Sequence, residues 1–293
     1  MNEFVALVLA AGRGRRMDLV TRKGPPVPKP LAEVAGLSSP LVVDTVKKLA
    51  RVENVKRVVV VLGYQADMVR GGVESALNAH KSGVPEEKDW DWTWTVANDW
   101  TKGPLFSFLA GAASLRLQGQ RDLLVVPGDT AFQFEPLREF ARSCAETLGA
   151  CHVAVVRVPS VSGEPRRAVR EVPTEWWSCH PPGVTCEVGG GGVVRDFHPS
   201  GQRHRSLFCA PMLHASREFV GWVVKNSKKW LGTTTECRVL DALAHWTRRG
   251  GKTLVVEVPP GCWWDFDRQE DWALWSEVVA ANPGFLRKFV PKF

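Results

Sequence analysis

The sequence predicts an α/β fold: a mainly parallel, mixed sheet flanked by helices, with a smaller lobe in the second half of the chain. Short β-branched runs alternate with segments of helical periodicity through residues 1–130, as in sheets covered on both faces. Two of the apolar runs end in polar loops, at Gly12 and at Asp129. Because ligands bind at the carboxyl ends of parallel strands, we expect these two loops to share one edge of the sheet.

The elements of the first half follow from short local signals. The first apolar run is too short to cross a membrane and suits a buried strand. Ser39 and Pro40 fit the cap and first turn of a helix. Alternating Trp residues at 91–97 predict a strand whose aromatic row packs against a helix or, alternatively, stacks bases. We expect strands at residues 4–11, 55–62, 91–97 and 123–126, and helices at 39–51, 64–80 and 104–117.

The second half is less regular in sequence. Residues 159–183 are rich in Pro, Arg and Trp, which predicts an irregular lobe. Four consecutive glycines between two short apolar segments predict a hairpin with a flexible turn at 186–197. We expect further strands at 151–158, 207–213 and 253–258, and helices at 135–148, 216–225, 239–249 and 270–281.

Composition and charge narrow the class of protein. The chain of 293 residues is 44% hydrophobic and 24% charged, the balance of a globular protein with a substantial core. The N-terminus carries Glu3 and no early Lys or Arg, so we interpret it as a core strand and not a signal peptide. Seven cysteines without a C-x-x-C pair indicate a reduced, cytoplasmic protein.

The positive charge is concentrated at the two ends. Of the net charge of +7, residues 1–30 contribute +4 and residues 285–293 contribute +3, so the remainder is neutral. A nucleic-acid-binding protein more often spreads its excess charge along one face. We therefore expect neither a nucleic-acid nor a membrane partner.

The loop after the first strand has the residues of a phosphate-binding device. Gly12 and Gly14 can take backbone angles that let amide groups converge on an anion. The cations that crowd the same segment are Arg13, Arg15, Arg16, Arg22, Lys23 and Lys29. The segment is not a dinucleotide loop, because Met17 replaces the third glycine, and it has no Gly-Lys-Ser/Thr of a P-loop.

Residues 9–17 and 28–31 resemble the signature L-A-A-G-x-G-x-R-M … P-K-P-L of the sugar- and polyol-phosphate nucleotidyltransferases. These enzymes join a nucleoside triphosphate to a phosphorylated acceptor and release pyrophosphate. The resemblance implies catalytic roles for Arg16, Lys29 and Asp129. It implies a nucleotide site that contains Leu9, Ala10, Ala11, Gly12, Gly14, Arg16, Lys29, Gly103 and Ser107.

Nucleotidyl transfer also needs a divalent cation, which we expect to be Mg²⁺ held by carboxylates and substrate phosphates. Asp129 follows a buried strand in a Gly-Asp turn. Near the C-terminus the family reads W-x-D-x-D-T-P-E-D-L, and this chain keeps the carboxylates but has Arg268 and Gln269 at the Thr-Pro positions. The expected metal ligands are Asp129, Asp265 and Asp267, and the choice between the last two stays open. We expect Asp271 to begin a helix.

The acceptor side resembles the branch of CTP:inositol-1-phosphate cytidylyltransferases most closely. Where many relatives have E-K-P after the hairpin, this chain has Phe197, His198 and Pro199. His198, Arg203 and Arg205 are the candidate replacements for the missing Lys, although a solvated basic turn would have the same composition.

We therefore expect one domain, residues 1–293, with a nucleotide-binding half at 1–134 and an acceptor-binding half at 135–293. The predicted reaction joins a nucleoside triphosphate, with CTP favoured, to a small phosphorylated polyol, sugar or alcohol. Two alternatives stay open: a catalytically silent relative that binds nucleotide, and a guanylyl- or uridylyltransferase acting on a sugar or cofactor phosphate. The sequence leaves a homodimer open.

Overall fold

The computed structural model describes residues 2–14, 27–81, 91–116, 122–147, 149–157, 184–198, 207–231 and 236–290. The predicted irregular lobe at residues 159–183 lies outside these ranges, as do residues 15–26, which include Arg15, Arg16, Arg22 and Lys23. Within the described chain, no helix combines the length and the apolar character that crossing a membrane requires.

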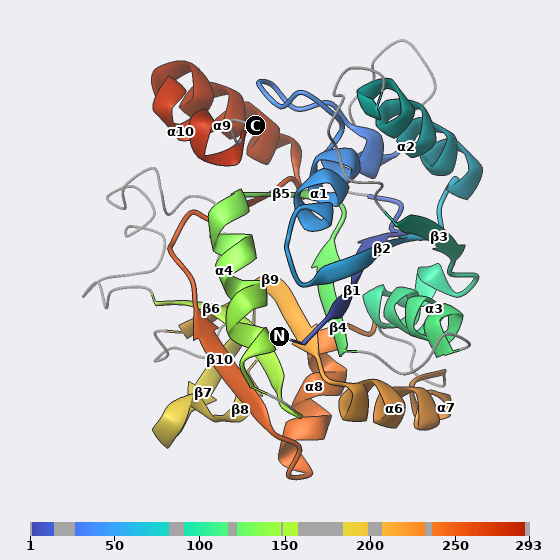
Figure 1. Ribbon diagram of the computed structural model, residues 1–293, viewed down its shortest axis with the longest axis vertical. Helices are drawn as coiled ribbons and strands as arrows, with labels where there is room; N and C mark the ends of the chain where they lie inside the picture. The colour runs from blue at the N-terminus through green and yellow to red at the C-terminus, as the bar shows by residue number, and fades with distance from the viewer. Residues whose placement is uncertain are drawn as a thin grey trace.

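A large mixed sheet forms the centre of the molecule (Figure 1). Its main path runs in the order β10-β6-β9-β4-β1-β2-β3. β9 is antiparallel to both of its neighbours, and the other pairs on this path are parallel. The predicted mainly parallel sheet is therefore confirmed. Its strands are β1 (Phe4–Ala10), β2 (Val55–Leu62), β3 (Trp92–Val96), β4 (Asp122–Pro127), β6 (Cys151–Arg157), β9 (Leu207–Ala215) and β10 (Thr253–Glu257).

Helices cover both faces of this sheet (Figure 1). Because successive side chains of a strand point to opposite faces, Phe4 and Ala6 join one core while Val5 and Leu7 join the other. The first core is closed by α1 (Leu41–Ala50), α2 (Ala66–Lys81) and α4 (Phe134–Ala145). The second is closed by α3 (Pro104–Arg116), α6 (Arg217–Lys225) and α8 (Val239–Arg248).

Some local predictions need correction. Ser39 does not cap α1: Pro40 occupies the cap position, and the Ser39 hydroxyl has no hydrogen-bond partner among the described residues. Three short elements were not predicted from the sequence: the 3-10 turns η2 (Lys29–Leu31) and η3 (Trp100–Lys102), and the helix α7 (Lys228–Leu231). The predicted hairpin is present as β7 (Thr185–Val188) and β8 (Val194–His198), with a glycine turn η5 (Gly190–Gly192) between them.

Of the two Trp residues of β3, one is partly buried and the other is exposed. Trp92 lies partly buried against the first core. Trp94 is 39% exposed, and the Arg70 guanidinium from α2 lies 4.8 Å from the centre of its ring. This arrangement fits strand-to-helix packing, the first of the two interpretations of the alternating pattern.

A second, two-stranded sheet was not predicted. β5 (Thr130–Phe132) pairs antiparallel with β11 (Trp263–Asp265), so that Thr130 lies opposite Asp265. The helices α9 (Gln269–Ala281) and α10 (Pro283–Phe289) follow, and Figure 1 shows them beside β5. This small sheet brings the end of the chain to the turn that contains Asp129.

An aromatic cluster fixes the C-terminal helices in place. Trp264, Trp275 and Phe285 pack edge to face, with ring centres 5.4–5.9 Å apart. The Trp275 indole N–H donates to the carbonyl of Ala35 at 2.8 Å. Such aromatic pairs stabilise a core beyond the area that they bury. The cluster therefore anchors the C-terminus to the segment just after Lys29.

A buried ion pair joins α1 to β5. Lys48, 1% exposed, donates from Nζ to Asp44 at 2.5 Å and to the carbonyl of Phe132 at 2.7 Å. Burial lowers the pKa of Lys48 and raises that of Asp44, and each partner opposes the shift of the other. The contact fixes β5, the strand that directly follows Asp129 in the chain, against α1.

We predict that Lys48→Met lowers the free energy of unfolding by roughly 3–5 kcal/mol, because it leaves a buried carboxylate and a carbonyl without their donor. Urea denaturation would measure the loss. The control Lys47→Met changes a half-buried residue of the same helix and should cost less than about 1 kcal/mol. Equal losses in the two variants would contradict the role of the pair, and Asp44→Leu with Lys48→Met should recover much of the stability.

Candidate active site

The two halves of the glycine and lysine motif meet at the carboxyl ends of β1 and β4. Leu9 pairs with Pro127 in the strand register, and the Gly128 N–H donates to the Leu9 carbonyl at 2.9 Å. Gly14 has a φ of +67°, and a Cβ there would lie 3.1 Å from the Lys29 side chain. The glycine therefore permits both a left-handed turn and the close approach of Lys29.

Lys29 is the centre of the site. It is 7% exposed, and its Nζ donates to Asp129 Oδ2 at 2.6 Å and to Asp267 Oδ1 at 2.8 Å. Burial alone would lower the pKa of Lys29, but the two carboxylates raise it well above its usual value. One ammonium group thus neutralises two acidic groups that are far apart in sequence. Asp129 lies 100 residues after Lys29 and Asp267 lies 238 residues after it, so the two carboxylates are 138 residues apart.

The two candidate carboxylates near the C-terminus have different environments. Asp265 accepts a hydrogen bond from the Thr130 hydroxyl at 2.5 Å. Its desolvation raises the pKa to about 6, although this hydrogen bond opposes the shift. The Asp267 side chain is 42% exposed and shares Lys29 with Asp129, whose side chain is 33% exposed. Asp129 and Asp267 therefore form the accessible acidic pair, while Asp265 is bound to the Thr130 hydroxyl of β5.

The other predicted nucleotide-site residues surround the same edge. Ala11 follows β1 and packs with Val61, Ala97 and Trp100. Gly103 precedes α3 with a φ of +109°, and a Cβ there would lie 2.7 Å from the Cys237 carbonyl oxygen. Leu9 is half-buried, Ala10 and Ser107 are buried, and Gly12 is exposed.

A cluster of one cationic and two aromatic side chains, which the sequence did not predict, lies beside this loop: Arg13, Tyr64 and Trp100. The Arg13 guanidinium lies 5.4 Å from the centre of the Tyr64 ring, and Tyr64 contacts Trp100 edge to face at 5.7 Å. The Tyr64 N–H donates to the Ala11 carbonyl at 3.0 Å. The position of Tyr64 just after a buried strand was the available signal. Thr130, directly after Asp129, was missed in the same way.

The predicted acceptor residues are only partly described. His198 ends β8 and lies opposite Thr185, which itself pairs with Phe208 of β9. The Nε2 atom of His198 is buried and lies 4.0 Å from the Glu187 carboxylate, with no hydrogen-bond partner among the described residues. Arg16, Arg203 and Arg205 lie outside the described residues.

The fold and this edge define an α/β protein in which a buried lysine beside a glycine turn contacts an accessible pair of carboxylates at the carboxyl ends of parallel strands. Residues 6–188 match the MobA-like NTP transferase domain, and the chain belongs to this family of nucleotidyltransferases. No curated protein sequence matches the chain.

The solved structures that are similar in fold include two nucleotidyltransferases. The inositol-1-phosphate CTP transferase from T. maritima is 17% identical with a TM-score of 0.63, over 95% of this chain and 97% of that one. A UDP-glucose pyrophosphorylase complexed with UDP-glucose is 16% identical with a TM-score of 0.64, over 96% of this chain and 100% of that one. The suspected relationship to the nucleotidyltransferases is therefore confirmed at the level of the family.

We predict that Asp265 makes the folded protein less stable as the pH rises. Between pKa 3.8 in the unfolded chain and about 6 in the folded protein, the folded state holds a proton that the unfolded state has released. The free energy of unfolding therefore falls across this window and the full loss is present above it. Asp265→Asn removes this titrating group. The free energy of unfolding of the variant should therefore fall less between pH 4 and pH 7 than that of wild type, by about 1–3 kcal/mol.

The measurement is urea denaturation at several pH values, with a chelator present so that no cation binds the nearby carboxylates. Asp91→Asn is the matched control, because Asp91 is an exposed carboxylate paired with Arg57 at 2.7 Å. If Asp265→Asn and wild type showed parallel pH profiles, the raised pKa would be refuted.

Proposed function

We propose that this protein transfers a nucleotidyl group from a nucleoside triphosphate, with CTP favoured, to a small phosphorylated polyol or sugar, releasing pyrophosphate. The observation that carries the proposal is the grouping of Lys29, Asp129 and Asp267 at the sheet edge beside the glycine loop. The family membership supports the reaction class.

The carboxylates suit a magnesium ion. Mg²⁺ takes hard oxygen ligands and is usually held by one or two carboxylates together with substrate phosphates. Asp129 and Asp267 contact the same ammonium group, so their oxygens already converge on one cation. Both are partly exposed, which leaves room for phosphate oxygens and water. We propose these two as the metal ligands, and Asp265 as the residue that positions Thr130. When bound, the ion neutralises charge on the transferring phosphate group.

Lys29 would then exchange its partners. When a divalent cation occupies the acidic pair, the Lys29 ammonium group becomes available to the triphosphate. In this proposal the triphosphate lies over the adjacent glycine loop. The backbone amides of that loop, with Arg13 and Arg16, would bind the β- and γ-phosphates. An oxygen of the acceptor phosphate attacks the α-phosphorus, the bond to the β-phosphate breaks, and pyrophosphate leaves. Cations that meet this growing charge lower the barrier.

The donor and acceptor identities rest on resemblance. Residues 239–252 resemble the inositol-phosphate branch in sequence, and the T. maritima structure named above is an inositol-1-phosphate CTP transferase that the chain matches over almost its full length. In this proposal residues 1–134 bind the nucleotide and residues 135–293 bind the acceptor, except that Asp267 reaches back to the metal. The cytoplasmic location and the homodimer stay predictions.

We predict that Asp129→Asn lowers kcat/KM by roughly a hundredfold or more, because the charge on the metal and phosphates loses a ligand. Asp267→Asn should have a similar effect and raise the Mg²⁺ concentration needed for activity. Pyrophosphate release, with the four triphosphates and a panel of phosphorylated polyols and sugars, measures the rates.

The control Asp91→Asn alters an exposed carboxylate near the start of β3, at the other end of the strands, and should stay within about twofold of wild type. Retention of full activity in Asp129→Asn would refute the metal assignment. A wild-type protein that binds triphosphates but releases no pyrophosphate with any acceptor would instead be a silent relative.

For the acceptor we predict that Arg203→Ala or Arg205→Ala raises the KM for the acceptor far more than the KM for the nucleotide, because each removes a cation near the acceptor phosphate. Steady-state kinetics with both substrates varied would separate the two constants. Arg195→Ala, which changes an exposed residue of β8, is the control and should change neither. If both KM values were unchanged in the two test variants, the turn would not belong to the site.

A further inference from the structure

A cluster of buried ligating side chains lies under α4, where β6 and β9 pair. Cys144 comes from the end of α4, His152 from β6 and His214 from β9, and all three are at most 2% exposed. One ligand atom from each, the Cys144 sulfur and a nitrogen of each imidazole, lies within 4.8 Å of the others. The proposed active site uses none of these groups.

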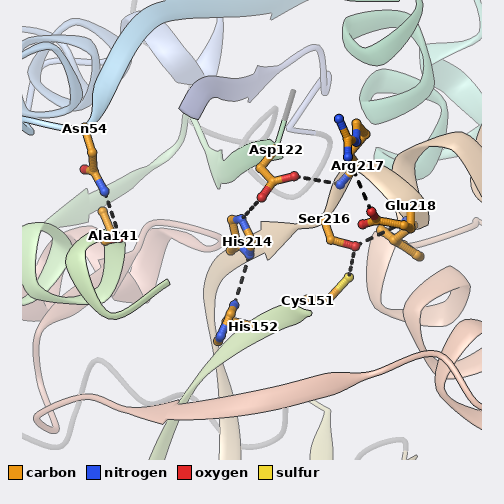
Figure 2. A network of polar contacts seen from close by, with 10 residues as sticks. Asn54, Asp122, Ala141, Cys151, His152, His214, Ser216, Arg217 and Glu218 are labelled. Atoms are coloured by element: carbon orange, nitrogen blue, oxygen red, sulfur yellow. Dashed lines mark hydrogen bonds and ion pairs between the residues drawn. The ribbon is translucent and has the colours of Figure 1, made fainter. Parts of the chain in front are cut away.

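The strand register creates this arrangement. His152 lies directly opposite His214 in the antiparallel pair, so both side chains point to the same face of the sheet. On that face they meet α4, whose Phe140, Ala141 and Cys144 pack in the same core. The two Nδ1 atoms are 3.0 Å apart, and Figure 2 marks this contact with a dashed line.

A carboxylate supports the cluster from outside. His214 Nε2 lies 3.3 Å from Asp122 Oδ2, and the other Asp122 oxygen accepts the Arg217 backbone N–H at 2.8 Å (Figure 2). At this distance the carboxylate attracts the proton to the outer nitrogen, although no hydrogen bond forms there among the described residues, and Nδ1 then keeps a lone pair directed at the cluster. This arrangement of carboxylate, imidazole and ligand point is the one that metal-binding histidines adopt.

We propose that Cys144, His152 and His214 bind a single zinc ion. A thiolate and two imidazoles are a donor set that Zn²⁺ accepts, with Zn–N of about 2.0–2.1 Å and Zn–S of about 2.3 Å. The three side chains would fill three corners of a tetrahedral site and a water molecule the fourth; the two nitrogens would then be about 3.3 Å apart and each about 3.6 Å from sulfur. The imidazole nitrogens, now 3.0 Å apart, need to separate by only a few tenths of an ångström, and the sulfur, which lies within 4.8 Å of a nitrogen of each imidazole, must move closer to them.

The charges of such a site are balanced. The Cys144 thiolate and the Asp122 carboxylate together offset the two positive charges of the ion, which a buried site requires. A hydrogen bond from His152 Nδ1–H to His214 Nδ1, with Asp122 fixing the tautomer of His214, also explains the contact of the two imidazoles, but it gives no role to the Cys144 sulfur. Zinc binding would use all four groups.

The location indicates a structural role. Asp122 and Phe4 begin β4 and β1, whereas Asp129 follows the end of β4. The cluster therefore lies at the amino end of these strands, and the acidic pair lies at the carboxyl end. An ion at the cluster would join α4 to two central strands without contacting the nucleotide, so it would add stability and not turnover.

Cobalt substitution tests the proposal. Chelator-treated protein is titrated with Co²⁺, and a thiolate-to-cobalt charge-transfer band in the near ultraviolet should saturate at one equivalent. Zn²⁺ should then displace Co²⁺ and remove the band. Oxygen ligands such as Asp129 and Asp267 give no such band, so binding at the acidic pair is not mistaken for binding at the cluster. Zn²⁺ should also raise the Tm of the chelated wild type.

The variant Cys144→Ala should lose both the band and the Tm increase, and Cys151→Ala should keep both. Cys151 is the matched control, because it is also buried but its sulfur contacts the Ser216 hydroxyl at 3.6 Å on the other face of β6. Circular dichroism checks that each variant is folded. Failure of wild type to bind one equivalent of Co²⁺ with this band, or persistence of the band in folded Cys144→Ala, would overturn the proposal.

Discussion

The structure of the candidate active site depends on one electrostatic constraint, the burial of the Lys29 ammonium group. A buried cation is costly unless carboxylates compensate it, and here the two that do so come from distant parts of the sequence. The requirement brings together the 3-10 turn at Lys29, the turn after β4 and the segment after β11. It also keeps Asp129 and Asp267 close, at the positions where the proposed metal ion would need them.

The surrounding packing makes this arrangement stable. β5 and β11 pair so that the Thr130 hydroxyl reaches Asp265. Lys48 fixes β5 from the side of α1, and the aromatic cluster around Trp275 holds the C-terminal helices against the segment after Lys29. Because rigid surroundings hold reacting groups in place, the parts of the chain far from the chemistry contribute to it by positioning.

The two ends of the sheet therefore have different chemistry. At the carboxyl end, partly exposed oxygen ligands suit a hard cation that arrives with a substrate. At the amino end, buried nitrogen and sulfur ligands suit a softer ion that stays in the fold. The same strands, β1 and β4, connect the two ends, and alternation along them separates the sheet's two cores. The site proposed for zinc and the site proposed for magnesium do not share a residue.

The sequence by itself determined the order of the main-sheet strands and the helices that cover them, and the shared edge of Gly12 and Asp129, because these follow from local periodicity and from the parallel strand rule. It did not determine β5 and β11, whose three-residue strands carry no periodic signal. Nor did it distinguish Asp265 from Asp267, since adjacent carboxylates look alike until a partner such as Thr130 or Lys29 is placed beside them. The pairing of His152 with His214 also depended on tertiary structure, because strand register alone brings residues 62 positions apart into contact.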